Sequence, residues 1–81
     1  MEAIERLVEE MRASPKSVRF ADLRKVCDHY FGKSRTQGSH RIYKMQWPGD
    51  PRINVQNDNG KAKAYQVKQV LQAIEKLESG D

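Results

Sequence analysis

The hydrophobic pattern changes its period twice along this 81-residue chain, and those changes restrict the fold more than any other feature. Apolar residues recur at helical spacing before residue 31, and again from residue 64 onward. Between residues 33 and 56 the chain instead holds short strand-like stretches, which turn residues such as glycine, proline and asparagine separate. The pattern therefore predicts two helices, three strands and a closing helix, in that order.

The expected boundaries follow from the same pattern. Helices are predicted over about residues 2–12, 19–30 and 64–77, and strands over residues 33–37, 39–45 and 52–56. The first two helices are separated at Ser14 and Pro15, because the residue before a proline resists helical geometry. Gly32 is the predicted stop of the second helix. Three consecutive strands with short links favour an antiparallel meander. The predicted fold class is α+β, a two-layer sandwich in which the helices cover one face of a three-stranded antiparallel meander.

Composition restricts the compartment and the kind of site. The single cysteine, Cys27, excludes an internal disulfide and indicates a reducing compartment. The first residues lack the pattern of a signal peptide, and no apolar run approaches the roughly 20 residues of a membrane helix. Two histidines and one cysteine at unrelated spacing argue against a zinc site. We expect a cytoplasmic domain with no membrane contact, no metal and no cofactor.

The net charge of +4 is distributed unevenly. Residues 1–12 carry two basic and four acidic side chains, whereas residues 13–44 carry eight basic and only two acidic ones. A concentrated positive charge favours a polyanionic partner such as a nucleic acid. On composition alone, an incidental solvated basic face remains an equal alternative.

The expected topology brings a histidine close to the start of the last helix. The beginning of the second strand lies beside the end of the third, so Ser39 and His40 should lie close to Gln56. Lys61 and Lys63 precede the last helix, where the helix dipole would favour acidic residues instead. Cations at that position suit a bound phosphate. The first strand adds Arg35 and Gln37 at the same end.

Each of these residues also has a purely structural interpretation. His40 shares a strand face with Ile42, so it could border the helices, and Gly38 suits a turn. His29 suits the dipole at the end of the second helix, and Cys27 falls on its buried stripe. Trp47 could stack on a base or a partner, or simply cover the end of the hairpin.

A family resemblance rests on the run Gln37-Gly38-Ser39-His40-Arg41-Ile42-Tyr43-Lys44 and on its ordered flanks. A helix ending in Tyr30-Phe31-Gly32 precedes this run; Ile53-Asn54-Val55, Asn59-Gly60-Lys61 and Val67-Lys68-Gln69-Val70-Leu71 follow it. This arrangement of a Gly-x-His strand opening, a third strand, a Gly-Lys turn and a closing helix resembles the HicA family of toxins. The resemblance covers about residues 18–77.

The resemblance implies a fold similar to that of double-stranded RNA-binding domains. It also implies a toxin of a toxin–antitoxin system: a ribonuclease that cleaves single-stranded mRNA without a metal and is neutralised by a cognate HicB antitoxin. His40 corresponds to the family's catalytic histidine. Residues 18–81 would form the HicA-like domain, with residues 1–17 as a helical extension and linker of one compact unit. The extension and the long loop at residues 45–51 depart from the family pattern.

The resulting hypothesis is an endoribonuclease in which His40 acts as general base on the ribose 2′-hydroxyl. The residues expected to bind RNA come from the Gly-x-His run and its basic surroundings: Gly38, Ser39, Arg35, Arg41, Lys44, Lys61 and Lys63. The general acid is not assigned, with Lys61 and His40 itself as candidates. We expect the toxin alone to be monomeric. Two alternatives remain: a non-catalytic RNA-binding module, and an interaction protein whose basic face meets an acidic protein.

Overall fold

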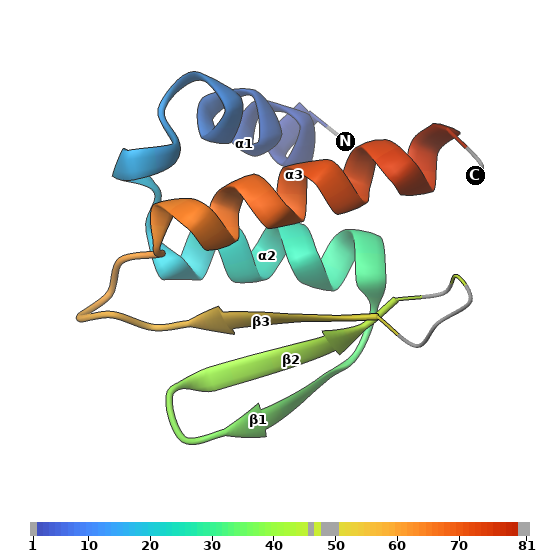
Figure 1. The fold of residues 1–81 in the computed structure, drawn as a ribbon. Helices are drawn as coiled ribbons and strands as arrows, with labels where there is room; N and C mark the ends of the chain where they lie inside the picture. Colours follow the sequence, from blue (N-terminus) through green and yellow to red (C-terminus); the bar gives the residue numbers. More distant parts are fainter. Residues whose placement is uncertain (1, 46, 48–50, 80–81) are drawn as a thin grey trace.

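The computed structural model describes residues 2–45, 47 and 51–79, and in that part of the chain three α-helices and three strands form. The helices are α1 (Glu2–Ala13), α2 (Phe20–Phe31) and α3 (Ala64–Ser79), and the strands are β1 (Ser34–Gln37), β2 (His40–Lys44) and β3 (Arg52–Gln56). Their order confirms the predicted α+β class (Figure 1). The loop expected at residues 45–51 lies in part outside the described residues.

The proline break between the first two helices forms as a separate short element. A 3₁₀ helix at Pro15–Ser17 follows α1, and the chain then turns into α2. The predicted stop of α2 is also confirmed, because Gly32 follows the helix with φ 83°, a backbone conformation that L side chains rarely adopt. Within the described residues, no helix combines the length and the apolar character needed to cross a membrane.

The three strands form one antiparallel sheet in the order β1-β2-β3. The sequence interpretation placed the start of β2 beside the end of β3, and the register confirms this, since His40 lies opposite Gln56. In the other direction, His40 lies opposite Gln37 of β1. Helices α2 and α3 lie on one side of the sheet and leave the other side uncovered (Figure 1).

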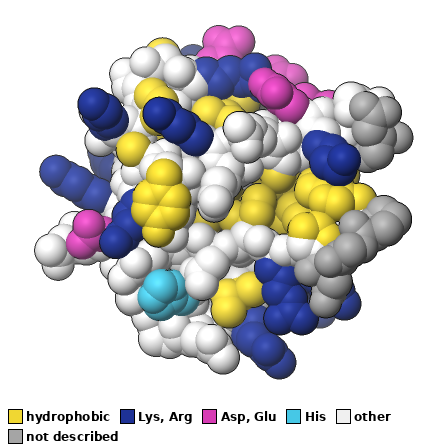
Figure 2. All heavy atoms as spheres, viewed as in Figure 1, with side chains coloured by type: hydrophobic (Ala, Val, Ile, Leu, Met, Phe, Trp, Pro, Cys, Tyr) yellow, Lys and Arg dark blue, Asp and Glu magenta, His cyan; other side chains and the backbone are white. Residues whose placement is uncertain are grey.

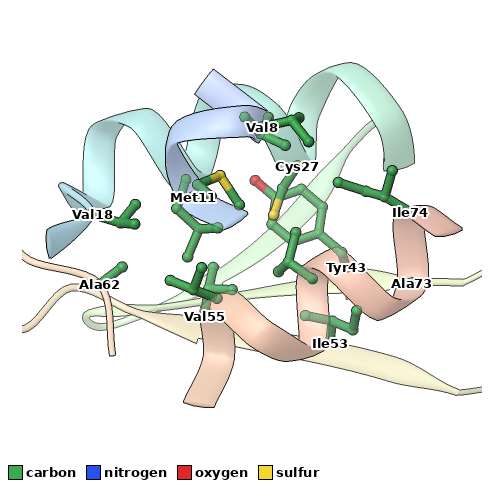
Figure 3. Packing of buried hydrophobic residues seen from close by; sticks show 14 of the residues in the cluster. Val8, Met11, Val18, Cys27, Tyr43, Ile53, Val55, Ala62, Ala73 and Ile74 are labelled. Carbon is green, nitrogen blue, oxygen red and sulfur yellow. The ribbon is translucent and has the colours of Figure 1, made fainter. Parts of the chain in front are cut away.

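The core lies between the sheet and these two helices. Leu23, Val26 and Cys27 of α2 are fully buried. Strands β2 and β3 contribute Tyr43 and Val55, which are also fully buried. Figure 3 shows side chains from α1, α2, β2, β3 and α3 meeting in one cluster. Burial of this apolar surface is the main favourable contribution to the stability of so small a domain.

Helix α1 belongs to the same core. It lies on the side of α2 and α3 that faces away from the sheet (Figure 1). Val8 and Met11 are buried in the common cluster, and Arg12 forms an exposed ion pair with Glu75 of α3 at 3.6 Å. An exposed pair contributes little to stability, so apolar packing fixes α1 in place. The acidic residues of this helix therefore lie away from the sheet.

We expect the thiol of Cys27 to be nearly unreactive in the folded protein. Burial, with a smaller contribution from the charge of Asp28, raises the pKa of Cys27 to about 12. Because the thiolate is the reactive form, alkylation by iodoacetamide at pH 8 should be at least about a hundredfold slower in the folded protein than in urea. Mass spectrometry measures this directly, since Cys27 is the sole cysteine of the chain.

The same shift has a consequence for stability in alkali. The folded-state pKa of Cys27 lies above the ordinary value of 9.0, so the contribution of the neutral thiol is fully present below about pH 9. This contribution is lost as the pH rises toward about 12, and the free energy of unfolding should fall over that range. Rapid alkylation of the folded protein at pH 8 would contradict the buried position of Cys27.

Candidate functional site

The candidate site lies on the uncovered side of the sheet. Side chains alternate between the two faces of a strand, and Tyr43, Ile53 and Val55 point into the core. The residues between them therefore point away from the helices. With their cross-strand partners they define what we call the open face: Arg35, Gln37, His40, Ile42, Lys44, Arg52, Asn54 and Gln56. This set includes three cationic side chains and no acidic one.

His40 lies on the open face, with its imidazole held by a neighbouring strand. Nδ1 of His40 is 2.8 Å from Oδ1 of Asn54, which lies diagonally across from it on β3. A carbonyl oxygen only accepts hydrogen bonds, so the Nδ1–H of the ring donates to it. In the neutral ring the lone pair is then on Nε2, the ring nitrogen that is not bonded to Asn54. The geometry thus presents a ring nitrogen that can accept a proton.

Cationic side chains surround a hollow at the other end of the open face. Its lining consists of Lys33, Ser34, Arg35, Ile42, Lys44 and Arg52. Ile42 is the next residue after His40 on the same strand face, about 7 Å along β2. Lys44 and Arg52 lie opposite each other on β2 and β3. Like charges held together in this way favour a bound anion, and phosphate groups fit that description.

The Gly-x-His run begins in the turn that precedes β2. Gly38 has φ 59° with open space where a side chain would start, so this position favours glycine for its backbone conformation alone. The carbonyl oxygen of Ser39 accepts a hydrogen bond of 2.9 Å from the backbone N–H of Asn57, just after β3. Both predicted residues are exposed beside His40. The turn and the end of β3 are therefore held together.

Lys61 and Lys63 lie in the loop between β3 and α3, at the same end of the molecule as the start of β2 (Figure 1). Two backbone hydrogen bonds join Lys61 to Asp58, at 2.9 and 3.0 Å. The carbonyl oxygen of Lys63 accepts the first hydrogen bonds of α3. Figure 2 shows Lys and Arg side chains gathered over this end, with hydrophobic side chains between them. The loop is therefore a fixed basic edge next to the open face.

Arg41 is the one predicted side chain that the structure separates from this group. It alternates with His40 along β2 and therefore points to the helix-covered side of the sheet. Its Nη1 donates a hydrogen bond of 3.0 Å to Oγ of Ser34. The structure thus places Arg35, His40 and Lys44 on the open face and Arg41 on the opposite side. Gln37 lies opposite His40 as expected, whereas Arg35 lies opposite Ile42 and lines the hollow rather than the His40 end.

The structure also shows where the residues with a purely structural interpretation lie. The interpretation of His40 as a residue that borders the helices is wrong, because His40 lies on the face of β2 opposite to that of the buried Tyr43. Cys27 is a core residue as predicted. His29 contacts Tyr30 in the last turn of α2, with ring centroids 5.0 Å apart. Trp47 is half-buried against the core, and Nζ of Lys76 lies 5.4 Å from its ring centroid.

Sequence reasoning missed several residues that belong to this region. Asn54 belongs to the alternating stretch 52–56, and this position could have identified it as a neighbour of His40. Arg52 follows from the same alternation. Tyr65 and Gln66, in the first turn of α3, had no signal that linked them to the site. Among the described residues, no three His, Cys, Asp or Glu side chains are grouped so that they could hold a metal ion.

Comparison of the chain with models of known families, with curated proteins and with solved structures gives no match.

Proposed function

We propose that this chain is an endoribonuclease that cleaves single-stranded mRNA with His40 as the general base, and that it acts as a toxin of the HicA type. The observation that carries the proposal is the imidazole of His40, which is fixed through Nδ1 by Asn54 on a basic, solvent-accessible sheet face. An imidazole is suited to proton transfer at neutral pH. Nearby cations can stabilise the charge that develops on a phosphate during cleavage.

The chemistry requires the RNA strand, these side chains and water. Nε2 of His40 takes the proton of a ribose 2′-hydroxyl, and the resulting oxyanion attacks the adjacent phosphorus. The bond from phosphorus to the 5′-oxygen of the next nucleotide breaks, and that oxygen takes up a proton from solvent. Arg35 and Lys44, which share the open face with His40, bind the flanking phosphates. The products are a 2′,3′-cyclic phosphate and a 5′-hydroxyl end.

The open face suits single-stranded RNA in shape as well as in charge. It carries a hollow whose lining includes Arg35, Lys44 and Arg52, and an RNA strand can lie across it. Lys61 and Lys63 extend the positive charge toward the start of α3. The HicA resemblance adds the expectation of a HicB-like antitoxin that neutralises the toxin, and of a monomeric toxin that acts in the cytoplasm.

Incubation of the purified protein with an end-labelled single-stranded RNA in EDTA tests the proposal. We expect cleavage to products that carry 2′,3′-cyclic phosphate and 5′-hydroxyl ends, identified by mass spectrometry. An RNA of the same sequence with 2′-O-methyl riboses is the control, and it should remain intact because it lacks the nucleophile. RNA that binds but stays intact after long incubation would instead support a non-catalytic RNA-binding module. Failure to bind RNA at all would favour an interaction protein.

A further inference from the structure

Tyr65 is the sole large hydrophobic side chain that is strongly exposed among the described residues, with 59% of its surface accessible. It lies in the first turn of α3, outside the stripe that Val67, Val70 and Ile74 bury. The core therefore does not account for an aromatic residue at this position. An exposed ring next to a polyanion-binding surface is a candidate for contact with a ligand.

A buried glutamine connects Tyr65 to the strand beside His40. Gln66 is 4% exposed, and its Oε1 accepts a hydrogen bond of 2.8 Å from the backbone N–H of Gln56. Its Nε2 donates to the hydroxyl of Tyr65 at 3.5 Å. Since Gln56 lies directly opposite His40, the ring of Tyr65 is linked to the end of β3 next to the proposed catalytic residue.

The sequence on both sides of Tyr65 is basic. Lys61 and Lys63 precede it, and Lys68 follows one helical turn later on the same side of α3. No acidic residue occurs between positions 59 and 74. The backbone that carries the two loop lysines is fixed to the start of α2, because the N–H of Ala62 donates to the carbonyl oxygen of Val18 at 2.9 Å. An exposed aromatic ring thus follows two lysines of a loop whose backbone is held by hydrogen bonds.

We propose that Tyr65 is a base-stacking subsite, on which the RNA base next to the cleaved bond lies while the lysines bind its phosphates. The combination of a stacking ring and backbone-binding cations is how proteins hold single-stranded nucleic acid without hydrogen bonds to the bases. A strand whose reacting phosphate lies at His40 reaches Tyr65 after it crosses β3. This inference rests on the proposed function. It adds a residue, Tyr65, that contacts a base of the RNA rather than its backbone.

The test compares RNA binding by variants made in a His40→Ala background, so that the RNA stays intact. Tyr65→Ala should weaken the binding of a short single-stranded RNA about tenfold, because stacking on the ring is lost. Tyr65→Phe keeps the ring and should bind within about twofold of the parent. Gln72→Ala, an exposed change two turns further along α3, is the control and should leave binding unchanged. Fluorescence anisotropy gives the dissociation constants, and circular dichroism confirms that each variant is folded.

A second RNA distinguishes stacking from an indirect effect. An oligonucleotide of the same length whose riboses carry no bases should bind the parent and Tyr65→Ala equally, since it has nothing to stack. An equal loss with both oligonucleotides, or no loss with either, overturns the inference.

The original protein, with His40 intact, separates the two proposals. If it cleaves RNA while Tyr65→Ala has no effect on binding, only the stacking subsite is wrong. If it neither binds nor cleaves RNA, the proposed function and the subsite are both wrong.

Discussion

Replacement of His40 with alanine is expected to abolish RNA cleavage, with a rate loss of about a thousandfold or more and little change in RNA affinity. General base catalysis contributes about 10²–10⁴ to a rate, and the remaining open-face residues include no second histidine to replace it. Affinity should persist because phosphate binding depends on the cations, whose positions do not depend on His40. The side chain is half-buried on the open face and is not part of the core cluster, so its removal should also leave the fold intact.

Single-turnover kinetics with labelled RNA measure the cleavage rate, and anisotropy measures affinity in parallel. His29→Ala is the matched control, because it removes the other histidine of the chain from the last turn of α2. It should keep the full cleavage rate. A fully active His40→Ala protein would rule out the assigned mechanism. A protein that loses affinity and rate together would show that His40 acts mainly in binding.

Much of the fold could be predicted because each element has a pattern of its own. The stripe of α3 repeats over four turns, and its buried members in the structure include Val67, Val70 and Ile74. Gly32 ends α2 where the sequence places a stop. Short links between strands leave an antiparallel meander as the simple solution, and that topology places His40 beside Gln56. These features depend on local sequence alone.

The side of the sheet that carries the site could not be predicted in the same way. Alternation groups His40 with Ile42, but β2 also contains Tyr43 in the opposite phase, and both phases include an apolar residue. The hydroxyl of Tyr43 donates a hydrogen bond of 2.6 Å to Oδ1 of Asp28 on α2. Burial, together with this bond, raises the pKa of Tyr43. Which face of β2 is buried thus depends on Asp28, which lies 15 residues away from Tyr43 in the sequence.

The hydrogen bond between Gln56 of β3 and Gln66 of α3 could not be predicted for a related reason. Gln66 is a polar residue at a buried position, which a search for apolar periodicity passes over. Its burial is tolerated because its Oε1 accepts a hydrogen bond from the backbone of Gln56. Only the folded chain brings those two residues together. Tyr65 lies off the buried stripe, and it is linked to the strand beside His40 only through this contact. The sequence alone therefore does not connect Tyr65 with His40.

Binding of single-stranded RNA is expected to weaken about 50-fold between 50 and 200 mM salt. This figure follows if four cations, Arg35, Lys44, Lys61 and Lys63, each contact a phosphate and release counterions from a single strand. The double variant Arg35→Gln, Lys44→Gln should keep the fold and retain only about half of the logarithmic salt dependence. Anisotropy titrations at several salt concentrations, with RNA in the His40→Ala background, measure both slopes.

A control with the same loss of charge makes this prediction specific to the open face. Arg6 and Lys25 are exposed on α1 and α2, and the double variant Arg6→Gln, Lys25→Gln lowers the net charge by the same amount. Counterion release depends on cations in contact with phosphates, so this variant should keep the slope of the parent. Equal slopes for both double variants would mean that overall charge, and not the open face, attracts the RNA. If the affinity of the parent protein for RNA did not depend on salt concentration, the proposed phosphate contacts would be wrong. Neutralisation of phosphates by cations always makes the binding constant depend on salt.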